Sequence, residues 1–181
     1  MKFLTILLFA TFEARNIPAF DENHSEDNLR LKLLAYQNAT SISNENFERL
    51  WNQRTRSSSN GFLGAVYHLN TPYSTSNHPI PFNLKRINSG MEYNNGIFLI
   101  LEPGYYRIVA HLKCNDNQLE YYIVKNSRDK LIYTRLEKWA VSSTHYITNL
   151  AQFDMIAIEL RYTATVGDAE DSNAIQIEKI N

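Results

Sequence analysis

Four of the five histidines lie after residue 60, and their side chains could serve a catalytic or metal site: His68, His78, His111 and His145. Imidazole groups bind metal ions and exchange protons near neutral pH. No two of them have the spacing of a zinc-binding HExxH motif, and the sequence has no GxSxG, GxGxxG or P-loop motif. We therefore predict no catalytic residue and no metal site. A catalytic carboxylate pair formed by folding remains the alternative.

The acidic run at residues 168–171 is a second candidate for chemistry. Carboxylate oxygens are the ligands that calcium prefers. The run lacks the glycine and the spacing of a known calcium loop, and most charge runs are solvated. We interpret it as a solvated loop and predict no cofactor, with calcium left as the open alternative.

Cys114 is the one cysteine of the chain. A single thiol cannot form an internal disulfide, so the core must hold the fold unaided. Cys114 ends an apolar stretch, and free cysteines are commonly buried. We predict a part-buried structural thiol, and the alternative is a disulfide to another chain.

The segments that precede these residues indicate a secreted protein. Residues 1–14 have a positive start, an apolar centre and the small residues Ala10 and Ala14, which predicts a signal peptide. The stretch is shorter than the roughly 20 apolar residues that span a bilayer. A buried N-terminal strand or helix is the alternative. Residues 15–28 form a polar segment and residues 55–60 a linker.

Residues 29–54 are expected to be helical. Their spacing alternates between four and three residues, as in a coiled-coil seam, but the middle of the seam is polar. The seam comprises Leu29, Leu33, Tyr36, Thr40, Ser43, Phe47, Leu50 and Arg54. The pattern allows one short coiled-coil stalk or two short helices. A stalk would promote self-association, whereas a helix could also pack on its own domain or remain loose.

Two sequons for N-linked glycosylation begin at Asn23 and Asn38. A secretory route would make both of them usable. Glycosylation at Asn38 would also require that face of the helix to be exposed to solvent. We therefore expect a glycoprotein.

From residue 61 onward the apolar residues alternate with a period of two, which is typical of strands with one buried face. His111 falls on the outward phase of one such strand. Turn sequences separate about ten short strands, and this predicts an all-β sandwich or barrel. The net charge of −1 gives no indication of nucleic acid binding or of an anionic membrane surface.

One stretch is more specific than the alternation. It reads PIPFN, then NSGMEYN, GIF and PGYY, and VKN and LAQFDMIAI follow further on. This order resembles the globular head domain of complement component 1q, which belongs to the tumour necrosis factor-like superfamily. The resemblance covers about residues 61–181. The positions that carry it are Pro79, Phe82, Tyr93, Gly96, Phe98, Pro103, Gly104 and Tyr106.

The chain departs from this family pattern at identifiable positions. Phe153 and Ser127 stand where the pattern has glycine, and Ile100 stands where it often has cysteine. The closing Phe-x-Gly-Phe-Leu of the family is poorly matched at residues 175–179. The sequence is therefore identified as a divergent member or a neighbour within the superfamily.

The resemblance implies a ten-stranded jelly roll at residues 61–181, which the short helical segment expected from the spacing at residues 29–54 would precede. It also implies a homotrimer, with residues 29–54 as the stalk if one exists, that binds extracellular protein or carbohydrate ligands. The implied role is innate immune pattern recognition or cytokine-like signalling. The alternatives are a structural component of a matrix or venom, and an enzyme on a jelly-roll scaffold.

Overall fold

The computed structural model describes residues 26–53, 63–166 and 173–180. These residues form two helices and ten strands. The helices are α1 (Glu26–Thr40) and α2 (Asn44–Gln53). The strands are β1 (Gly64–His68), β2 (Leu84–Ser89), β3 (Met91–Asn94), β4 (Ile97–Ile100), β5 (Gly104–Lys113), β6 (Gln118–Lys125), β7 (Asp129–Glu137), β8 (Val141–Leu150), β9 (Met155–Leu160) and β10 (Ala174–Ile180).

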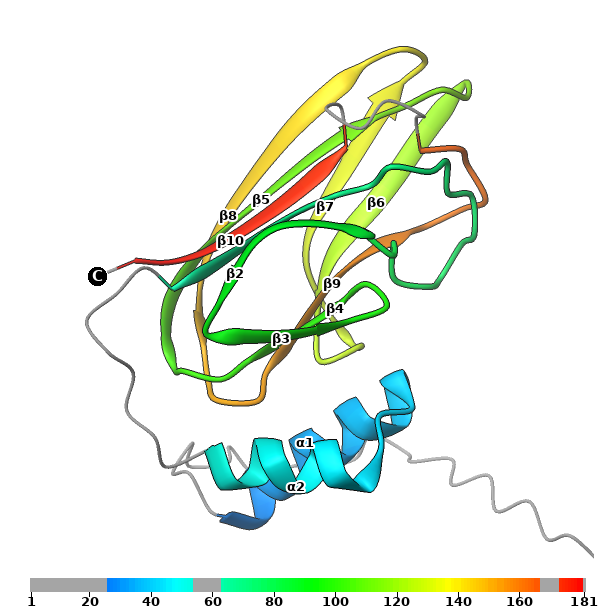
Figure 1. Cartoon of the computed structure of the whole chain (residues 1–181). Helices are drawn as coiled ribbons and strands as arrows, with labels where there is room; N and C mark the ends of the chain where they lie inside the picture. Colours follow the sequence, from blue (N-terminus) through cyan, green and yellow to red (C-terminus); the bar gives the residue numbers. More distant parts are fainter. Residues whose placement is uncertain (1–25, 54–62, 167–172, 181) are drawn as a thin grey trace, which may run out of the picture.

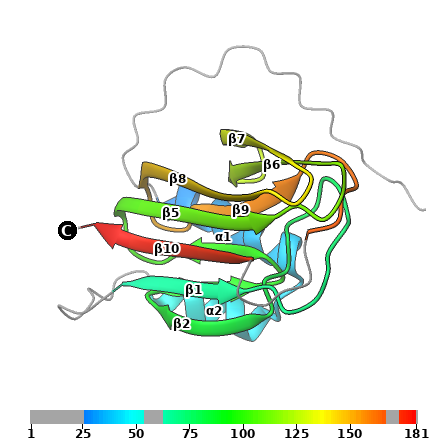
Figure 2. The same ribbon diagram turned by 90° about the horizontal axis from the view of Figure 1, so that it is seen from above.

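The strands form two antiparallel sheets packed face to face (Figure 1). The first sheet has the order β2-β1-β10-β5-β8, and Figure 2 shows these strands side by side. The second sheet has the order β3-β4-β9-β6-β7. The last strand, β10, lies between β1 and β5, so both ends of the β-region meet within one sheet. The predicted all-β jelly roll with preceding short helices is confirmed.

Alternate residues of most strands fill the space between the sheets, whereas β2 has no buried residue. Ile108, Ile158 and Ile177 are fully buried in this core, as the period of two predicts. A polar network crosses the core, where the Thr144 hydroxyl lies 2.6 Å from that of Tyr121 and 2.8 Å from that of Thr134. The network joins β8 of the first sheet to β6 and β7 of the second, and each hydroxyl has a partner, as buried polar groups require.

The helical segment is two helices and not one continuous coiled coil. Ser41 has φ of 54°, which ends the helical path after α1. Ser43 starts α2, because its Oγ accepts a hydrogen bond from the Asn46 amide at 3.3 Å. The polar residues in the middle of the predicted seam therefore form a break and an N-cap. No described helix is both long and apolar enough to cross a membrane.

The apolar seam of both helices packs on the outer side of the second sheet. In Figure 1 the helices lie below β3 and β4. The strand side contributes Ile97, Leu99, Phe153 and Met155, and the helix side contributes Leu29, Leu33, Tyr36, Phe47 and Leu50. We call this outer side of the second sheet the covered face. The apolar seam of the helices therefore packs on the protein's own sheet. This is the alternative of a helix packed on its own domain, and not the coiled-coil stalk.

A buried carboxylate fixes the helices to the sheet. Asp154 lies 2.6 Å from the Lys32 Nζ of α1 and 2.9 Å from the Lys125 Nζ of β6. The Ala151 and Asn126 N–H groups also donate to it, at 2.8 Å and 3.1 Å. Burial alone would raise the pKa of Asp154, but these partners outweigh it and hold that pKa below its ordinary value.

Two departures from the family pattern adopt the backbone conformation that glycine prefers. Phe153 has φ of 62° and Ser127 has φ of 60°. A left-handed conformation costs an L-residue about 1–2 kcal/mol. The Phe153 ring is fully buried against the helices, so its packing offsets this cost. Ser127 is exposed in its turn and has no comparable compensation.

Candidate functional site

The outer side of the first sheet carries no helix in the described residues, and we call it the open face. Its outward side chains follow from the strand register, which places Tyr105 opposite Ile180 and Arg107 opposite Ile147. Tyr105 and Ile147 are each 61% exposed. The exposed large apolar side chains of this face are Ile87, Tyr105, Val141, Ile147 and Ile180. Of these, Tyr105, Ile147 and Ile180 lie together at one end of the face, and Val141 lies at the other end opposite Lys113. Exposed apolar groups gathered in this way mark interaction surfaces.

One ion pair lies among these apolar groups. Arg107 donates to Glu178 at 2.5 Å across neighbouring strands. Both side chains keep substantial exposure, so the pair contributes little to the stability of the monomer. An exposed apolar surface with an arginine near its centre has the composition of a protein–protein interface.

Three histidines lie across the other end of the open face. His68 and His111 both pair with Ala174, from opposite sides of β10. His145 is hydrogen-bonded to Ser143, the residue opposite His111. Burial, and then the neighbouring His145 and His68, lower the pKa of His111 below its ordinary value. The described part of the chain contains no group of three potential metal ligands close enough to hold an ion.

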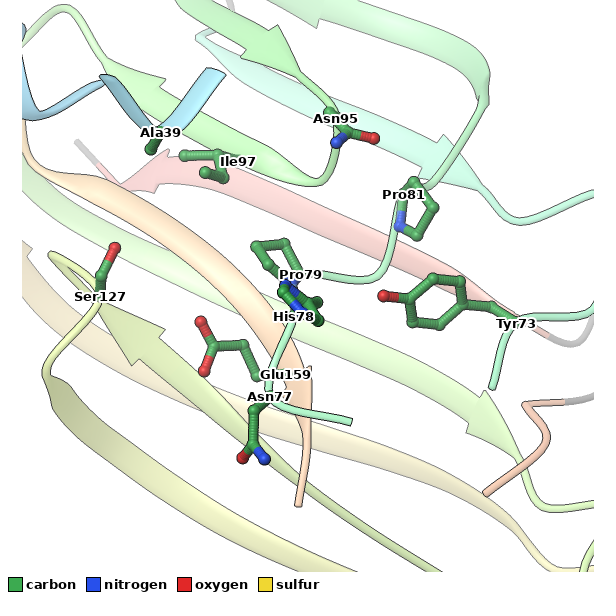
Figure 3. A pocket seen from close by; sticks show the side chains of 10 residues that line it. All are labelled: Ala39, Tyr73, Asn77, His78, Pro79, Pro81, Asn95, Ile97, Ser127 and Glu159. Carbon is green, nitrogen blue, oxygen red and sulfur yellow. The ribbon is translucent and has the colours of Figure 1, made fainter. Parts of the chain in front are cut away.

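A second feature lies on the opposite side of the sandwich and is shown in Figure 3. It is a cavity of about 490 Å³ that we call the side pocket. Its polar lining includes Tyr73, Asn77, His78, Asn95, Ser127 and Glu159. Prolines 79 and 81, together with Ala39 and Ile97, supply apolar walls.

The side pocket forms at the edge of β9 where the helical cover ends. β4 pairs with the first half of β9, and residues 77–80 run beside the second half, with the Ile80 amide donating to the Ile158 carbonyl. Gly96 closes the gap between β4 and this segment. A Cβ at Gly96 would lie 2.6 Å from the Ile80 carbonyl oxygen, and its φ is 89°, so glycine is required there.

Glu159 is the half-buried carboxylate of the side pocket. It is the outward residue of β9 directly opposite Tyr122 of β6. Burial raises the pKa of Glu159 above its ordinary value, although Lys130 and His78 act in the opposite direction. Its carboxylate makes no hydrogen bond or close ion pair with the residues that the structure describes. A partly desolvated acceptor with no hydrogen-bond donor is suited to ligand binding.

The structure places some of the sequence-predicted site residues and not others. Asn38 is exposed on α1, as glycosylation would require. Asn23, the signal peptide at residues 1–14, the linker at 55–60 and the acidic run lie outside the described residues. Cys114 is a free, fully buried thiol that donates to the Asp116 carbonyl, and burial raises its pKa. His111 is on the outward phase, as predicted, but half-buried.

The eight residues that carry the family resemblance are distributed through the fold and are not gathered in one site. Phe82, Phe98 and Tyr106 are fully buried in the core. The Tyr93 hydroxyl donates to the Phe82 carbonyl at 2.5 Å and accepts from the Gly96 amide at 3.0 Å. These residues specify the architecture. Pro79 alone also lines the side pocket.

Sequence reasoning did not identify the open face or the side pocket. Tyr105 and Ile147 could have been found as large apolar residues on the outward phase of their strands. Glu159 carries a weaker signal, since a carboxylate on an otherwise apolar strand is the only irregularity in that strand. Its neighbours Tyr73 and His78 come from a loop more than 80 residues earlier, which no local pattern connects to β9.

Comparison with known proteins bears on the fold. No family model matches the chain, and no curated protein matches it. Among solved structures, murine APRIL is 16% identical over 65% of this chain and 99% of its own, with a TM-score of 0.52. The Eiger TNF of S. frugiperda is 13% identical over 66% of this chain and 93% of its own, with a TM-score of 0.54. The globular domain of zebrafish complement 1qA is 17% identical over 65% of this chain and 96% of its own, with a TM-score of 0.51. These likenesses confirm the predicted jelly roll of the complement 1q and tumour necrosis factor-like domains.

Proposed function

We propose that this protein is a secreted, non-enzymatic recognition module that assembles as a homotrimer through the open face and binds extracellular protein or carbohydrate ligands. The role would be innate immune recognition or cytokine-like signalling. The observation that supports it most is the set of exposed apolar side chains around Tyr105 and Ile147. The number three comes from the resemblance to complement component 1q, which the shared fold supports.

Self-association offers a physical reason for the composition of the open face. Full burial of one such side chain stabilises by about 1.5–3 kcal/mol, so several of them together would favour association. A tyrosine and an arginine among aliphatic groups are the residue types that contribute most at interfaces. Secretion rests on the predicted signal peptide and the sequons at Asn23 and Asn38.

Light scattering of the purified full-length protein tests the assembly. We expect a mass three times that of the monomer at micromolar concentration. The variant Ile147→Arg should be monomeric, because it places an unpaired charge in the interface. The control Leu31→Arg changes an equally exposed apolar residue of α1, 66% exposed, and should leave the trimer intact. A monomeric parent protein, or equal effects of both variants, would contradict the proposal.

A further inference from the structure

We infer that the side pocket binds a sugar unit of a glycan, with the Glu159 carboxylate accepting hydrogen bonds from its hydroxyl groups. This inference specifies the ligand class of the proposed recognition module and rests on that function, but it does not require the open-face assembly. Nothing in the family resemblance points to this pocket, since its polar lining lies outside the residues that carry the resemblance.

The shape of the pocket fits a small polar ligand. Its volume of about 490 Å³ falls within the roughly 300–1,000 Å³ typical of small-molecule sites. Figure 3 shows side chains from the loop at residues 73–81, from β9 and from the turn before β4 arranged around one space. Because Gly96 fixes the contact between that turn and residues 79–80, the pocket is largely formed before any ligand arrives.

The hydrogen-bonding groups favour a hydroxyl-rich ligand. Glu159 can only accept when ionised, the amides of Asn77 and Asn95 can donate and accept, and the Ser127 hydroxyl can do both. A sugar hydroxyl also does both, so neighbouring hydroxyls can satisfy this mixed set. An anionic ligand would be repelled by the carboxylate.

The charges around Glu159 argue against a cationic ligand. Lys130 and His78 already act on this carboxylate, as the direction of their influence on its pKa shows. Lys130 Nζ lies 4.1 Å from the ring centre of Tyr122, the residue opposite Glu159. A further ammonium group would have to enter beside these basic groups. A neutral donor avoids that repulsion.

Flat apolar surfaces extend from the pocket and suit the C–H face of a sugar ring. The rings of Tyr73 and Pro79 lie inside the pocket. Beyond Glu159, the rings of Tyr122 and Tyr133 lie 5.5 Å apart on the outer side of β6 and β7. Aromatic faces beside polar groups combine apolar contact with orientation, and the Tyr122–Tyr133 pair could contact a second sugar unit.

The location makes the pocket compatible with a trimer. β9 belongs to the second sheet, residues 77–80 run beside it through the Pro79–Glu159 bridge, and Glu159 points away from the first sheet that carries the open face. Assembly through the open face would therefore leave one pocket free on each subunit. Three weak sugar sites acting together would give much higher avidity than one.

Saturation-transfer NMR with the full-length protein and the methyl glycosides of glucose, galactose, mannose and N-acetylglucosamine tests the inference. We expect saturation transfer to at least one glycoside. The variant Glu159→Gln should weaken its binding about tenfold, because an ionised acceptor is lost. The matched control Glu137→Gln alters an exposed β7 carboxylate outside the pocket and should leave binding unchanged.

Three outcomes would overturn the inference: no transfer to any glycoside, equal binding by the parent and Glu159→Gln, and Glu159-dependent binding of ethanolamine or putrescine without binding of glycosides. Circular dichroism of each variant confirms that the fold is retained. Light scattering on the same samples separates the two proposals. Sugar binding by a monomer would contradict the assembly alone, and a trimer that binds no glycoside would contradict the pocket alone.

Discussion

The two outer faces of the sandwich carry similar apolar side chains, but these are buried on one face and exposed to solvent on the other. On the covered face, Leu99 and Phe153 are fully buried under the helices. On the open face, Tyr105 and Ile147 are each 61% exposed. The strands of both faces alternate in the same way, so the difference arises from what lies outside each sheet.

This contrast teaches that apolar outward residues in a sandwich require a cover, and that the cover can come from the same chain or from another. For the second sheet the cover is α1 and α2, which precede the first strand in sequence. For the first sheet no described segment supplies one. The open face is therefore where a second copy would be most effective in burying apolar surface.

The largest expected effect comes from breaking the covered face. Leu33 of α1 is fully buried against the second sheet, and Leu33→Ala should destabilise the protein by about 2–5 kcal/mol through lost contacts and a cavity. Leu31→Ala, two residues away and 66% exposed, should change stability by about 0.5 kcal/mol or less. Urea unfolding followed by circular dichroism measures both. Equal effects would mean that the helices do not pack on the sheet.

A smaller effect is expected from the two residues that replace the glycines of the family pattern. Phe153→Gly relieves the left-handed strain but loses a buried ring, for a net loss of about 2 kcal/mol. Ser127→Gly relieves the same strain at an exposed turn and should gain up to about 1 kcal/mol. Thermal unfolding of both variants shows whether each one loses or gains stability relative to the parent protein. A gain from Phe153→Gly would show that the helical cover adds little.

The sequence predicted the sandwich because alternation and turn residues are local signals. It did not predict which face would be covered, because that depends on packing between residues far apart, which brings Leu33 and Leu99 into one buried cluster. The sequence showed that Phe153 replaces a glycine of the family pattern. It did not show that the Phe153 ring packs against the helices, because that contact forms only on folding. The side pocket was also missed, since Tyr73 and Glu159 meet only after folding.

Lowering the pH should affect the open face and leave the covered face unchanged. Of the effects predicted here, this change in free energy is expected to be the smallest. The folded pKa of His111 is lowered, so the folded state takes up its proton less readily than the unfolded state. Its stability contribution is present above about pH 6.5 and is lost as the pH falls below that value. His68, His145 and Lys113 lie on the same face, and Glu178 is already paired with Arg107.

The covered face should resist the same change in pH. The folded pKa of Asp154 is below its ordinary value, so its contribution persists down to about pH 4 and is lost only as the pH falls further. In the proposed trimer, a proton on His111 would also add charge to the open face. Between pH 7.5 and pH 5 we therefore expect light scattering to show a shift from trimer toward monomer, while the helical circular dichroism signal stays constant. His111→Gln should reduce the shift, and His78→Gln, in the side pocket, should not. A loss of helical signal at pH 5 with the trimer intact would reverse the assignment of the two faces, because the helices would then depend on groups that titrate near neutral pH.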